Sequence, residues 1–579
     1  MIIRGKIAPE NNESSGSKEK ATRRLAFLVA ILIGFVLVIV VQLFRLQVFG
    51  GGPVPPPPPP STPEVASHRG LITDRRGYFL ALNTFEYDVS AAPSLLEDPW
   101  DAASRLSRLL GLSPDELLSL LTQDVPYVPL KQRVSNEVAE AITSLGLKDK
   151  GIYLEPKLRR KYPEGKLAAH LLGFVRYDCN GAYGLEGYYD LTLKGTGTLP
   201  KGVVYPWDEA LPIVFDKLAL PPDGPYLILT LDRNIQYLVE QELAEAVRKY
   251  DADGGTVIVM DPKTGAILAM ASYPSYDPNH FYDVPPELYN NPAVSEQYEP
   301  GSVFKIITMA AGLDAGVITP RSTFYDSGAI EVGGWLIQNP GQRAHGLVSM
   351  TDILAYSLNV GVAYVSTSLG EERFYTYLRG FGFGCETGID LSGEIAGSLK
   401  MPGSSKWSKS DLGTNAFGQG VAVTPLQMIT AVAAVANRGF LMKPYVVGRI
   451  VDDQGVVVTQ PTVVRQVIST QTAEQLTDML VETVERGAEL AIVTGYDIAG
   501  KTGTAQIPVG DHYDPELTIA SFVGYAPADD PRFIALVKID KPRMATEGTQ
   551  VAAPVFKAIA ERLFVLLDVP PDSVRLASR

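Results

Sequence analysis

Hydrophobic positions divide this chain into one long uninterrupted apolar run and a body of shorter, punctuated patterns. The run from Leu25 to Phe44 contains 20 residues without a charged side chain, which is long enough for a helix that spans a bilayer. Basic residues at positions 18–24 precede it, so the positive-inside rule places residues 1–24 in the cytoplasm and the body outside. A cleaved signal peptide is the alternative, but its apolar core of about 7–15 residues would end at a small-x-small site. We therefore expect an uncleaved anchor over residues 25–46, in a single-pass protein of the cytoplasmic (inner) membrane.

Glycine and proline dominate the segment after the anchor. Gly50–Gly52 is followed by the proline run Pro55–Pro60; glycine supplies slack, and polyproline forms a stiff, extended spacer. We interpret residues 47–65 as a stalk, and a ligand for a proline-binding module is the alternative. The cytoplasmic tail, residues 1–24, is polar and lacks the apolar surface that a folded core requires.

Strand and helix patterns alternate in a first folded region, residues 66–235. Within it, Gly70–Ala81 predicts a strand, an Asp/Gly turn and a second strand. Residues 98–147 carry Leu, Ile and Ala at helical spacing and predict helices. Short strands and turns follow over 151–235, and a helix is expected near Ile235–Tyr250.

A second folded region, residues 236–568, predicts a sheet built from early and late strands with helices between them. Its first two strands are joined by a turn in which Pro262 and Gly265 reverse the chain. The expected elements are strands over Gly255–Met260 and Ala266–Ala271, helices from Ser302, over 350–380 and over 424–437, strands over Ile498–Gln506, Ile519–Tyr525 and Arg532–Ile539, and a helix over Val551–Leu566. Helices bracketed by strands predict an α+β fold, with one antiparallel sheet covered by helices. Residues 569–579 are expected to form a C-terminal tail.

Charge and cysteine content exclude several classes of function. The net charge of −14 gives no electrostatic footprint for nucleic acid. No Cys/His cluster has the spacing of metal ligands, so no metal site is expected. The cysteines, Cys179 and Cys385, could pair if they lie outside the membrane, but two unpaired and mostly buried thiols are the favoured interpretation.

A serine and a lysine one helical turn apart form the first candidate for chemistry. Ser302 follows Pro300-Gly301 and opens an apolar helical run, so Lys305 lies on the same helix face. A serine hydroxyl needs a base to become a nucleophile, and a lysine can serve only if burial and nearby positive charge keep part of it neutral. The alternative is a helix cap beside a solvated lysine.

Two later motifs add small polar groups in apolar surroundings. Ser357-Leu358-Asn359 interrupts an apolar stretch, where a helix-end capping pair is the alternative interpretation. Lys501-Thr502-Gly503-Thr504 lies on an expected strand, where glycine would let a ligand approach closely and the lysine and threonines would suit a carboxylate. An exposed turn is the alternative here. The copies Ser15–Lys18 and Ser17–Lys20 fall in the polar tail, and Lys263-Thr264-Gly265 falls at a hairpin tip, so none of these is expected to be catalytic.

In their order and separation, the three motifs resemble the signature of the penicillin-binding proteins: Ser-x-x-Lys, Ser-x-Asn and Lys-Thr-Gly. The resemblance extends to blocks around Tyr298–Ser302, Phe381–Leu391 and Phe417–Met428. Upstream, blocks over 69–75 and 162–187 are similar to the pedestal of class B members, which carry no glycosyltransferase domain. The fold implied is an elongated, dimerisation-like pedestal domain over 66–235, followed by a penicillin-binding/serine β-lactamase-like transpeptidase domain over 236–568.

The resemblance also implies a role for each motif residue in peptidoglycan D,D-transpeptidation. Ser302 would attack the penultimate D-Ala carbonyl of a stem peptide, Lys305 would take its proton, and Ser357 would relay protons. Asn359 would bind the donor peptide and Lys305. The Lys501–Thr504 motif (Lys501, Thr502, Gly503, Thr504) would hold the terminal carboxylate, and the backbone N–H groups of Ser302 and Thr504 would form the oxyanion hole.

Details around the third motif favour the division-associated branch of class B, with an elongation-type transpeptidase as the alternative. These details are the sequences over 498–506 and 520–527 and the short interval between His170 and Glu186. The resemblance implies that no cofactor is needed. The implied partners are peptidoglycan stem peptides, β-lactams, a membrane-embedded glycan polymerase and other proteins of the division complex. A β-lactamase and a non-enzymatic penicillin sensor on the same fold remain the rival interpretations.

Overall fold

The computed structural model describes residues 69–147, 150–194, 224–452, 454–509 and 512–577, together with Gly34, residues 36–38 and Val41. The chain divides into two compact units, Met1–Ala66 and Ser67–Arg579. Most of the expected anchor, and all of the cytoplasmic tail and stalk, lie outside the described residues. Within the described ranges, no helix combines the length and apolar character needed to cross a bilayer.

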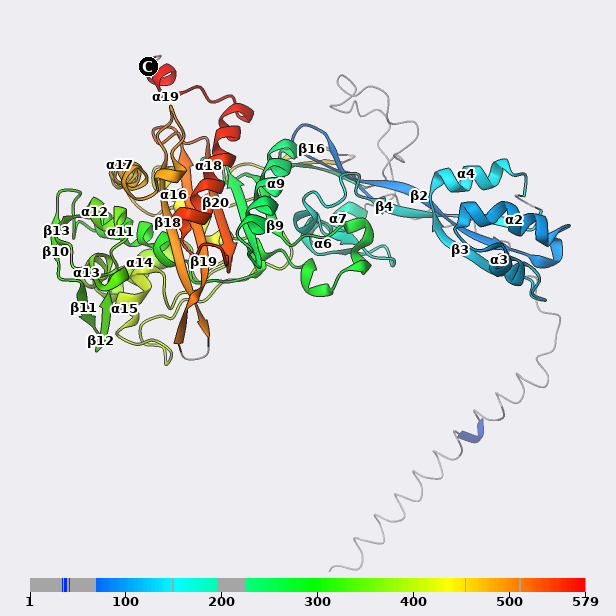
Figure 1. Cartoon of the computed structure of the whole chain (residues 1–579), viewed down its shortest axis with the longest axis horizontal. Helices are drawn as coiled ribbons and strands as arrows, with labels where there is room; N and C mark the ends of the chain where they lie inside the picture. Colours follow the sequence, from blue (N-terminus) through cyan, green and yellow to red (C-terminus); the bar gives the residue numbers. More distant parts are fainter. Residues whose placement is uncertain are drawn as a thin grey trace, which may run out of the picture. The chain divides into compact units, whose positions relative to one another are not determined.

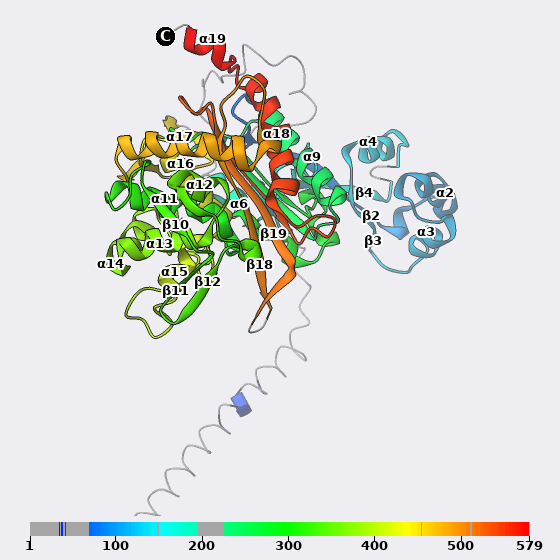
Figure 2. The ribbon, with the colours of Figure 1, turned by 60° about the vertical axis from the view of Figure 1, so that its left-hand side comes forward.

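A five-stranded antiparallel sheet forms the core of the C-terminal part of the second unit, in the order β18-β19-β20-β8-β9 (Figure 1). Its strands are β8 (Gly254–Met260), β9 (Ile267–Tyr273), β18 (Ala499–Val509), β19 (His512–Ala526) and β20 (Phe533–Asp540). These match the early and late strands expected from the sequence, and every pairing is antiparallel. In Figures 1 and 2, the β18–β19 pair extends past the end of the other strands.

Alternating side chains of this sheet contribute to two separate cores. On β8, Val257 packs in one core with residues of α9 (Arg233–Lys249) and α18 (Gly548–Leu566). Ile258, its neighbour, points to the opposite face and packs with residues of α11 (Lys305–Asp314) and α16 (Pro425–Ala436). This period of two explains why the strand is buried throughout: both of its faces are covered by helices. The helices that complete the second face are α12 (Met350–Ala355), α13 (Asn359–Leu369), α14 (Glu371–Gly380) and α17 (Thr470–Gly487).

A seven-stranded sheet organises the N-terminal part of the second unit. Its order is β16-β15-β7-β1-β2-β3, with β4 paired to β2. The strands are β1 (Ile72–Thr73), β2 (Phe79–Ala91), β3 (Val128–Val134), β4 (Ile152–Lys161), β7 (Tyr226–Leu229), β15 (Val447–Asp452) and β16 (Gly455–Val458). The predicted strand–turn–strand at 70–81 is therefore confirmed as the β1–β2 pair. Two strands of this sheet, β15 and β16, come from the region expected to form only the later domain.

The sequence pattern predicted helices over residues 98–147, but the structure shows that this stretch also contains a strand. It contains α2 (Pro99–Leu110), α3 (Pro114–Leu121) and α4 (Asn136–Ser144), but strand β3 lies between the last two. On β3, Val128 and Leu130 are buried while Pro129 and Lys131 are exposed. This alternation over a few residues is the signature of a strand with one buried face, and it was hidden among longer helical patterns.

Both cysteines are unpaired, as favoured, but the expectation that they are buried is wrong. Cys179 and Cys385 are free and exposed. Cys179 has a positive φ of 64° in the turn between β5 (Phe174–Val175) and β6 (Gly181–Ala182). Cys385 lies in the loop beyond α14. Residues at such chain reversals face solvent whatever their hydrophobicity.

Candidate active site

Ser302 lies in a short 3₁₀ turn, η4 (Gly301–Phe304), which continues directly into α11. Gly301 has a φ of +56°, a conformation that glycine adopts without steric cost. Val303 and Phe304 are fully buried and anchor the turn, whereas Ser302 is only partly covered. The structure thus places Ser302 at the start of the helix, in a turn that is fixed by the buried side chains of Val303 and Phe304 and by its continuation into α11.

Lys305 joins the first motif to the second. Its side chain is fully buried, and Nζ lies 2.5 Å from the Ser357 carbonyl oxygen, 3.2 Å from Ser357 Oγ and 2.8 Å from Asn359 Oδ1. Two of these partners are carbonyl oxygens, which can only accept hydrogen bonds. A neutral amine would donate its two N–H groups to these carbonyl oxygens, and its lone pair would remain free to accept a hydroxyl proton. The solvated lysine considered as an alternative is not what the structure shows.

The second motif is a strained turn rather than a pair of helix caps. Ser357 has a φ of +57° between α12 and α13, which is costly for a residue other than glycine. Its hydroxyl and carbonyl face Lys305, and Asn359 turns its amide in the same direction while donating from Nδ2 to the Gln338 carbonyl at 3.1 Å. The residue at the N-cap of α13 is Leu358, which has no side-chain capping bond. The oxygen atoms of Ser357 and Asn359 therefore accept hydrogen bonds from Lys305 instead of capping a helix.

The third motif supplies a second buried lysine on strand β18, an edge strand of the sheet. Lys501 is 1% exposed, and among the described residues its Nζ forms hydrogen bonds only with its neighbour Thr502, at 3.0 Å to the carbonyl oxygen and 3.4 Å to Oγ1. Burial lowers the pKa of Lys501 to about 7. Burial, and secondarily the positive charge of Lys501, lowers the pKa of Lys305 well below its usual value. Two ammonium groups in one buried site favour the neutral form of Lys305, which the base role requires.

Gly503 and Thr504 contact the protein itself more closely than the sequence suggested. A Cβ at Gly503 would lie 2.5 Å from Ser521 Oγ and 3.2 Å from the Pro300 carbonyl oxygen. The glycine is thus required where β18 packs against its neighbouring strand and the segment before Ser302, in addition to any role toward a ligand. Thr504 Oγ1 accepts a hydrogen bond of 3.0 Å from Gly548 N at the start of α18. Its hydroxyl proton stays available, and the side chain is exposed.

Sequence reasoning missed a carboxylate that fixes the segment before Ser302. Glu299 accepts a hydrogen bond of 2.9 Å from Gly420 N and receives the Tyr513 hydroxyl at 3.1 Å. Burial raises the pKa of Glu299. Tyr513 stands far away in sequence, on β19, so no local pattern around Glu299 could have signalled this contact.

The repeated Lys-Thr-Gly sequence at 263–265 is a hairpin tip, as predicted. It lies in the turn between β8 and β9, where Lys263 pairs with Asp530 at 2.5 Å on the surface. The Ser15 and Ser17 copies of the first motif lie outside the described residues.

Gly418→Ala should slow acylation of Ser302 much more than Gly334→Ala. Both glycines have φ near +80°, so both substitutions cost about 1–2 kcal/mol of backbone strain. A Cβ at Gly418 would also lie 2.4 Å from the Gly301 carbonyl oxygen and 2.7 Å from Gly301 N, whereas Gly334 has open space around it. The Gly418 variant must therefore displace the turn that carries Ser302. Stopped-flow acylation by a β-lactam measures the difference, and equal rates in the two variants would contradict it.

Comparisons with known proteins agree with this geometry. Residues 255–561 match the penicillin-binding protein transpeptidase domain, and residues 64–199 match the penicillin-binding protein dimerisation domain. The chain belongs to the penicillin-binding protein family. It is of class B, and is a peptidoglycan D,D-transpeptidase.

Relatives of this penicillin-binding protein align over most of its length. Stage V sporulation protein D of Bacillus subtilis is 37% identical, over 87% of this chain and 79% of its own. The peptidoglycan D,D-transpeptidase FtsI homolog of Mesostigma viride is 29% identical, over 87% of this chain and 88% of its own. Among solved structures, penicillin-binding protein 3 of Mycobacterium tuberculosis complexed with aztreonam superimposes with a TM-score of 0.67. That structure is 30% identical and covers 87% of this chain and 97% of its own.

Proposed function

We propose that this penicillin-binding protein cross-links peptidoglycan through an acyl-serine intermediate on Ser302, with Lys305 as the general base. The observation that carries the proposal is the position of Lys305 Nζ: buried, bonded to Ser357 and Asn359, and depressed in pKa by burial and by Lys501. Lys305 takes the Ser302 hydroxyl proton as Oγ bonds to the penultimate D-Ala carbonyl carbon. The bond to the terminal D-Ala nitrogen breaks, and Ser357 passes a proton to that nitrogen.

The second half-reaction runs through the same groups. An amine of a neighbouring stem peptide attacks the acyl carbon, its proton leaves through Ser357 and Lys305, and Ser302 Oγ is released with its proton restored. In both halves the charge that develops on the carbonyl oxygen would be held by the backbone N–H groups of Ser302 and Thr504. Such a donor contributes about 3–4 kcal/mol to stabilisation of the transition state. The Lys501–Thr504 motif would bind the terminal carboxylate of the donor stem.

A labelled β-lactam tests this proposal and separates it from its rivals. The transpeptidase should form one stable acyl adduct on Ser302 and, with stem-peptide substrates, release D-Ala and form cross-links. Rapid turnover of the β-lactam would indicate a β-lactamase instead. A stable adduct without any cross-linking activity would indicate a sensor on the same fold.

We further propose that the enzyme acts in division (septal) wall synthesis. The support is the set of sequence blocks around the third motif and the similarity to a protein named as an FtsI homolog. A fluorescent fusion should gather at the division plane, beside a membrane-embedded glycan polymerase and other division proteins. A uniform distribution along the growing side wall would favour an elongation role.

A protease added to protoplasts should cut the Gly50–Pro63 segment and release a soluble fragment that still binds β-lactam. The expectation follows from the proposed single-pass topology, with residues 1–24 in the cytoplasm, the anchor in the cell membrane and the catalytic body outside. The fragment should keep its fold because the second compact unit begins at Ser67 and contains its own cores. Gel electrophoresis with fluorescent penicillin reads the result. Protection of the body inside intact protoplasts would overturn the topology.

A further inference from the structure

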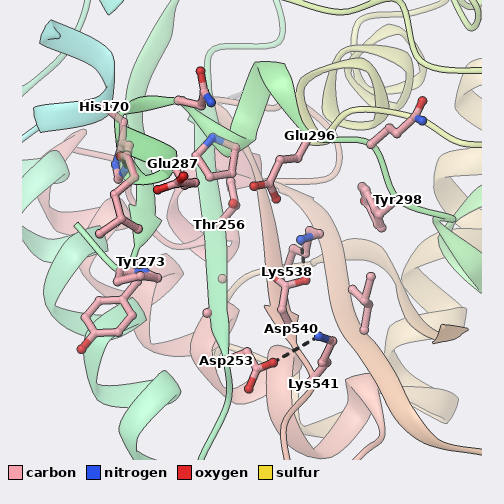
Figure 3. Close-up of a pocket in the computed structure, with 18 of the residues that line it drawn as sticks. His170, Asp253, Thr256, Tyr273, Glu287, Glu296, Tyr298, Lys538, Asp540 and Lys541 are labelled. Carbon is pink, nitrogen blue, oxygen red and sulfur yellow. Dashed lines mark hydrogen bonds and ion pairs between the residues drawn. The ribbon is translucent and has the colours of Figure 1, made fainter. Parts of the chain in front are cut away.

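Asp326 is a fully buried carboxylate that the proposed mechanism does not use. It is the last residue of β10 (Thr323–Asp326). Several carboxylates of the second unit form ion pairs with lysine or arginine, as Asp253 does with Lys541 at 3.2 Å (Figure 3). Asp326 has no such partner within the described ranges, and the one titratable group that pairs with it there is His345.

Neutral donors surround the Asp326 carboxylate. Asn339 Nδ2 donates to both of its oxygens, at 2.9 and 2.8 Å, and Gly328 N donates at 3.1 Å. His345 donates from its backbone N and from Nδ1, each at 3.0 Å. An ionised carboxylate is costly to bury, and these hydrogen bonds offset the cost. Because a neutral side chain of the same size would avoid that cost altogether, the value of Asp326 lies in the donors that it holds in place.

Asn339 connects Asp326 to the start of α13. It follows β12 (Trp335–Gln338), is 3% exposed, and its Oδ1 accepts a hydrogen bond of 3.1 Å from Val360 N. The first N–H groups of a helix have no partner within the helix, and the N-cap residue, Leu358, supplies no side-chain bond. The side-chain cap of α13 therefore comes from Asn339, which stands 21 positions before Val360.

The same segment fixes the orientation of the Asn359 amide. Asn359 Nδ2 donates to the Gln338 carbonyl at 3.1 Å, and Asn359 Oδ1 accepts from Lys305 Nζ at 2.8 Å. Because an amide carries its donor and its acceptor on different atoms, holding Nδ2 at Gln338 directs Oδ1 toward Lys305. A displacement of residues 338–339 would therefore move the acceptor away from Lys305 Nζ.

The His345 ring contacts the residue that precedes Ser357. It stacks on Tyr356, with ring centroids 5.9 Å apart and planes inclined by 15°. The two residues that donate their side chains to Asp326, Asn339 and His345, thus contact the chain on both sides of Ser357, which has a φ of +57°. Such a strained conformation persists only where the surrounding structure fixes it.

We propose that Asp326 and Asn339 are positioning residues for the second motif: together they keep Asn359 Oδ1 within hydrogen-bond distance of Lys305 Nζ. The consequence for catalysis rests on the proposed function, in which Lys305 is the base, whereas the position of Asn359 does not depend on it. Neither residue is assigned a contact with the reacting atoms.

Stopped-flow acylation of Ser302 at saturating β-lactam, in the full-length, detergent-solubilised protein, measures the effect on the base. Asn339→Ala and the nearly isosteric Asp326→Asn should each lower the rate constant by about 10–100-fold, as small displacements in active sites do. Asn83→Ala is the matched control. Asn83 is 1% exposed, and its amide donates to the Arg69 carbonyl and accepts from Arg160 in the N-terminal sheet. This control should unfold at a lower temperature than the parent, as Asn339→Ala should, but it should acylate at the parental rate.

A double-mutant cycle determines whether Asn339 acts through Asn359. Asn359→Ala removes the acceptor for Lys305, so the addition of Asn339→Ala should lower the rate little further. If the two single effects multiply instead, Asn339 does not act through Asn359 and the inference is wrong. Equal losses of rate in Asn83→Ala and Asn339→Ala would also overturn it.

Crystal structures of the variants test the positions independently of the reaction. In Asn339→Ala, or in Asp326→Asn if the alanine variant does not fold, Asn359 Oδ1 should lie more than about 3.5 Å from Lys305 Nζ. In Asn83→Ala the parental 2.8 Å should remain. An unchanged distance in the first two variants would contradict the inference, and failure of both to fold would show that the pair serves the fold as a whole.

Labelling of Ser302 in the parent separates this inference from the proposed function. If Ser302 is labelled and the distance between Asn359 and Lys305 is unchanged in the variants, only the positioning role fails. If the distance lengthens and Ser302 of the parent is not labelled, only the proposed mechanism fails.

Discussion

Ser302→Ala abolishes covalent labelling by β-lactams and leaves the protein folded. Two other hydroxyls lie near the buried lysines, Ser357 Oγ at 3.2 Å from Lys305 Nζ and Thr502 Oγ1 at 3.4 Å from Lys501 Nζ, but only Ser302 is assigned the nucleophile's role by the proposed mechanism. The Ser302 side chain is only partly buried, and such substitutions change the free energy of unfolding by roughly 0.5 kcal/mol. Mass spectrometry of the intact protein after incubation with penicillin measures the adduct, and thermal unfolding measures the fold.

Thr264→Ala is the matched control for this result. Thr264 belongs to the other Lys-Thr-Gly sequence, and its hydroxyl donates to Asp261 at 2.8 Å within the β8–β9 turn. Labelling of this variant should equal that of the parent. Ser15 and Ser17 should be equally dispensable. An adduct that persists in Ser302→Ala would place the nucleophile elsewhere and remove the basis of the mechanism.

Lys305→Arg lowers the rate of acylation by roughly 10²–10⁴-fold, the usual contribution of a general base. Arginine keeps the positive charge but cannot lose its proton in a protein. Because arginine is also bulkier in a fully buried position, Lys305→Gln serves as a second variant: it is smaller and equally unable to act as the base. Stopped-flow acylation of folded protein gives both rates. Near-parental acylation by either variant would rule out Lys305 as the base.

The pH dependence of acylation provides an independent check on Lys305. The base must be neutral, so the rate rises with pH through the lowered pKa of Lys305. Lys501→Met removes the charge that contributes to this lowering, so the pKa of Lys305 rises and the rising limb moves to higher pH. Lys501→Arg keeps a permanent positive charge, so the rising limb of its pH profile should lie at no higher pH than that of the parent. A limb that stays in place in Lys501→Met would show that Lys501 does not act on Lys305.

Local patterns predicted the elements that carry the motifs. The strands over 254–273 and 499–540, and the helix that begins at Lys305, agree with short-range alternation and helical spacing in the sequence. The contact of Lys305 with Asn359 was expected from the family resemblance alone, because nothing in local sequence encodes a contact across 54 positions. The positive φ of Ser357 was equally hidden, since it is imposed by packing and not by residue preference.

Contacts between distant segments account for the features that the sequence did not reveal. The hydrogen bond from Tyr513 to Glu299 joins positions 214 apart. Strand β3 was masked by its helical neighbours, and the exposure of Cys385 depends on a loop whose path only the fold decides. In each case the residue types were compatible with several environments, and tertiary packing selected one of them.

The seven-stranded sheet sets the order in which the newly made chain can fold. β7 pairs with β15 through partners such as Leu229 and Val447, so roughly 220 residues must be synthesised after β7 before its partner exists. At about 5–20 residues per second, β7 waits roughly 10–40 s with one edge unpaired. An open edge of this kind can pair with another chain. The N-terminal sheet of this protein is therefore completed late, by residues that emerge well after Ser302, and the unpaired edge of β7 is where a chaperone would have most effect.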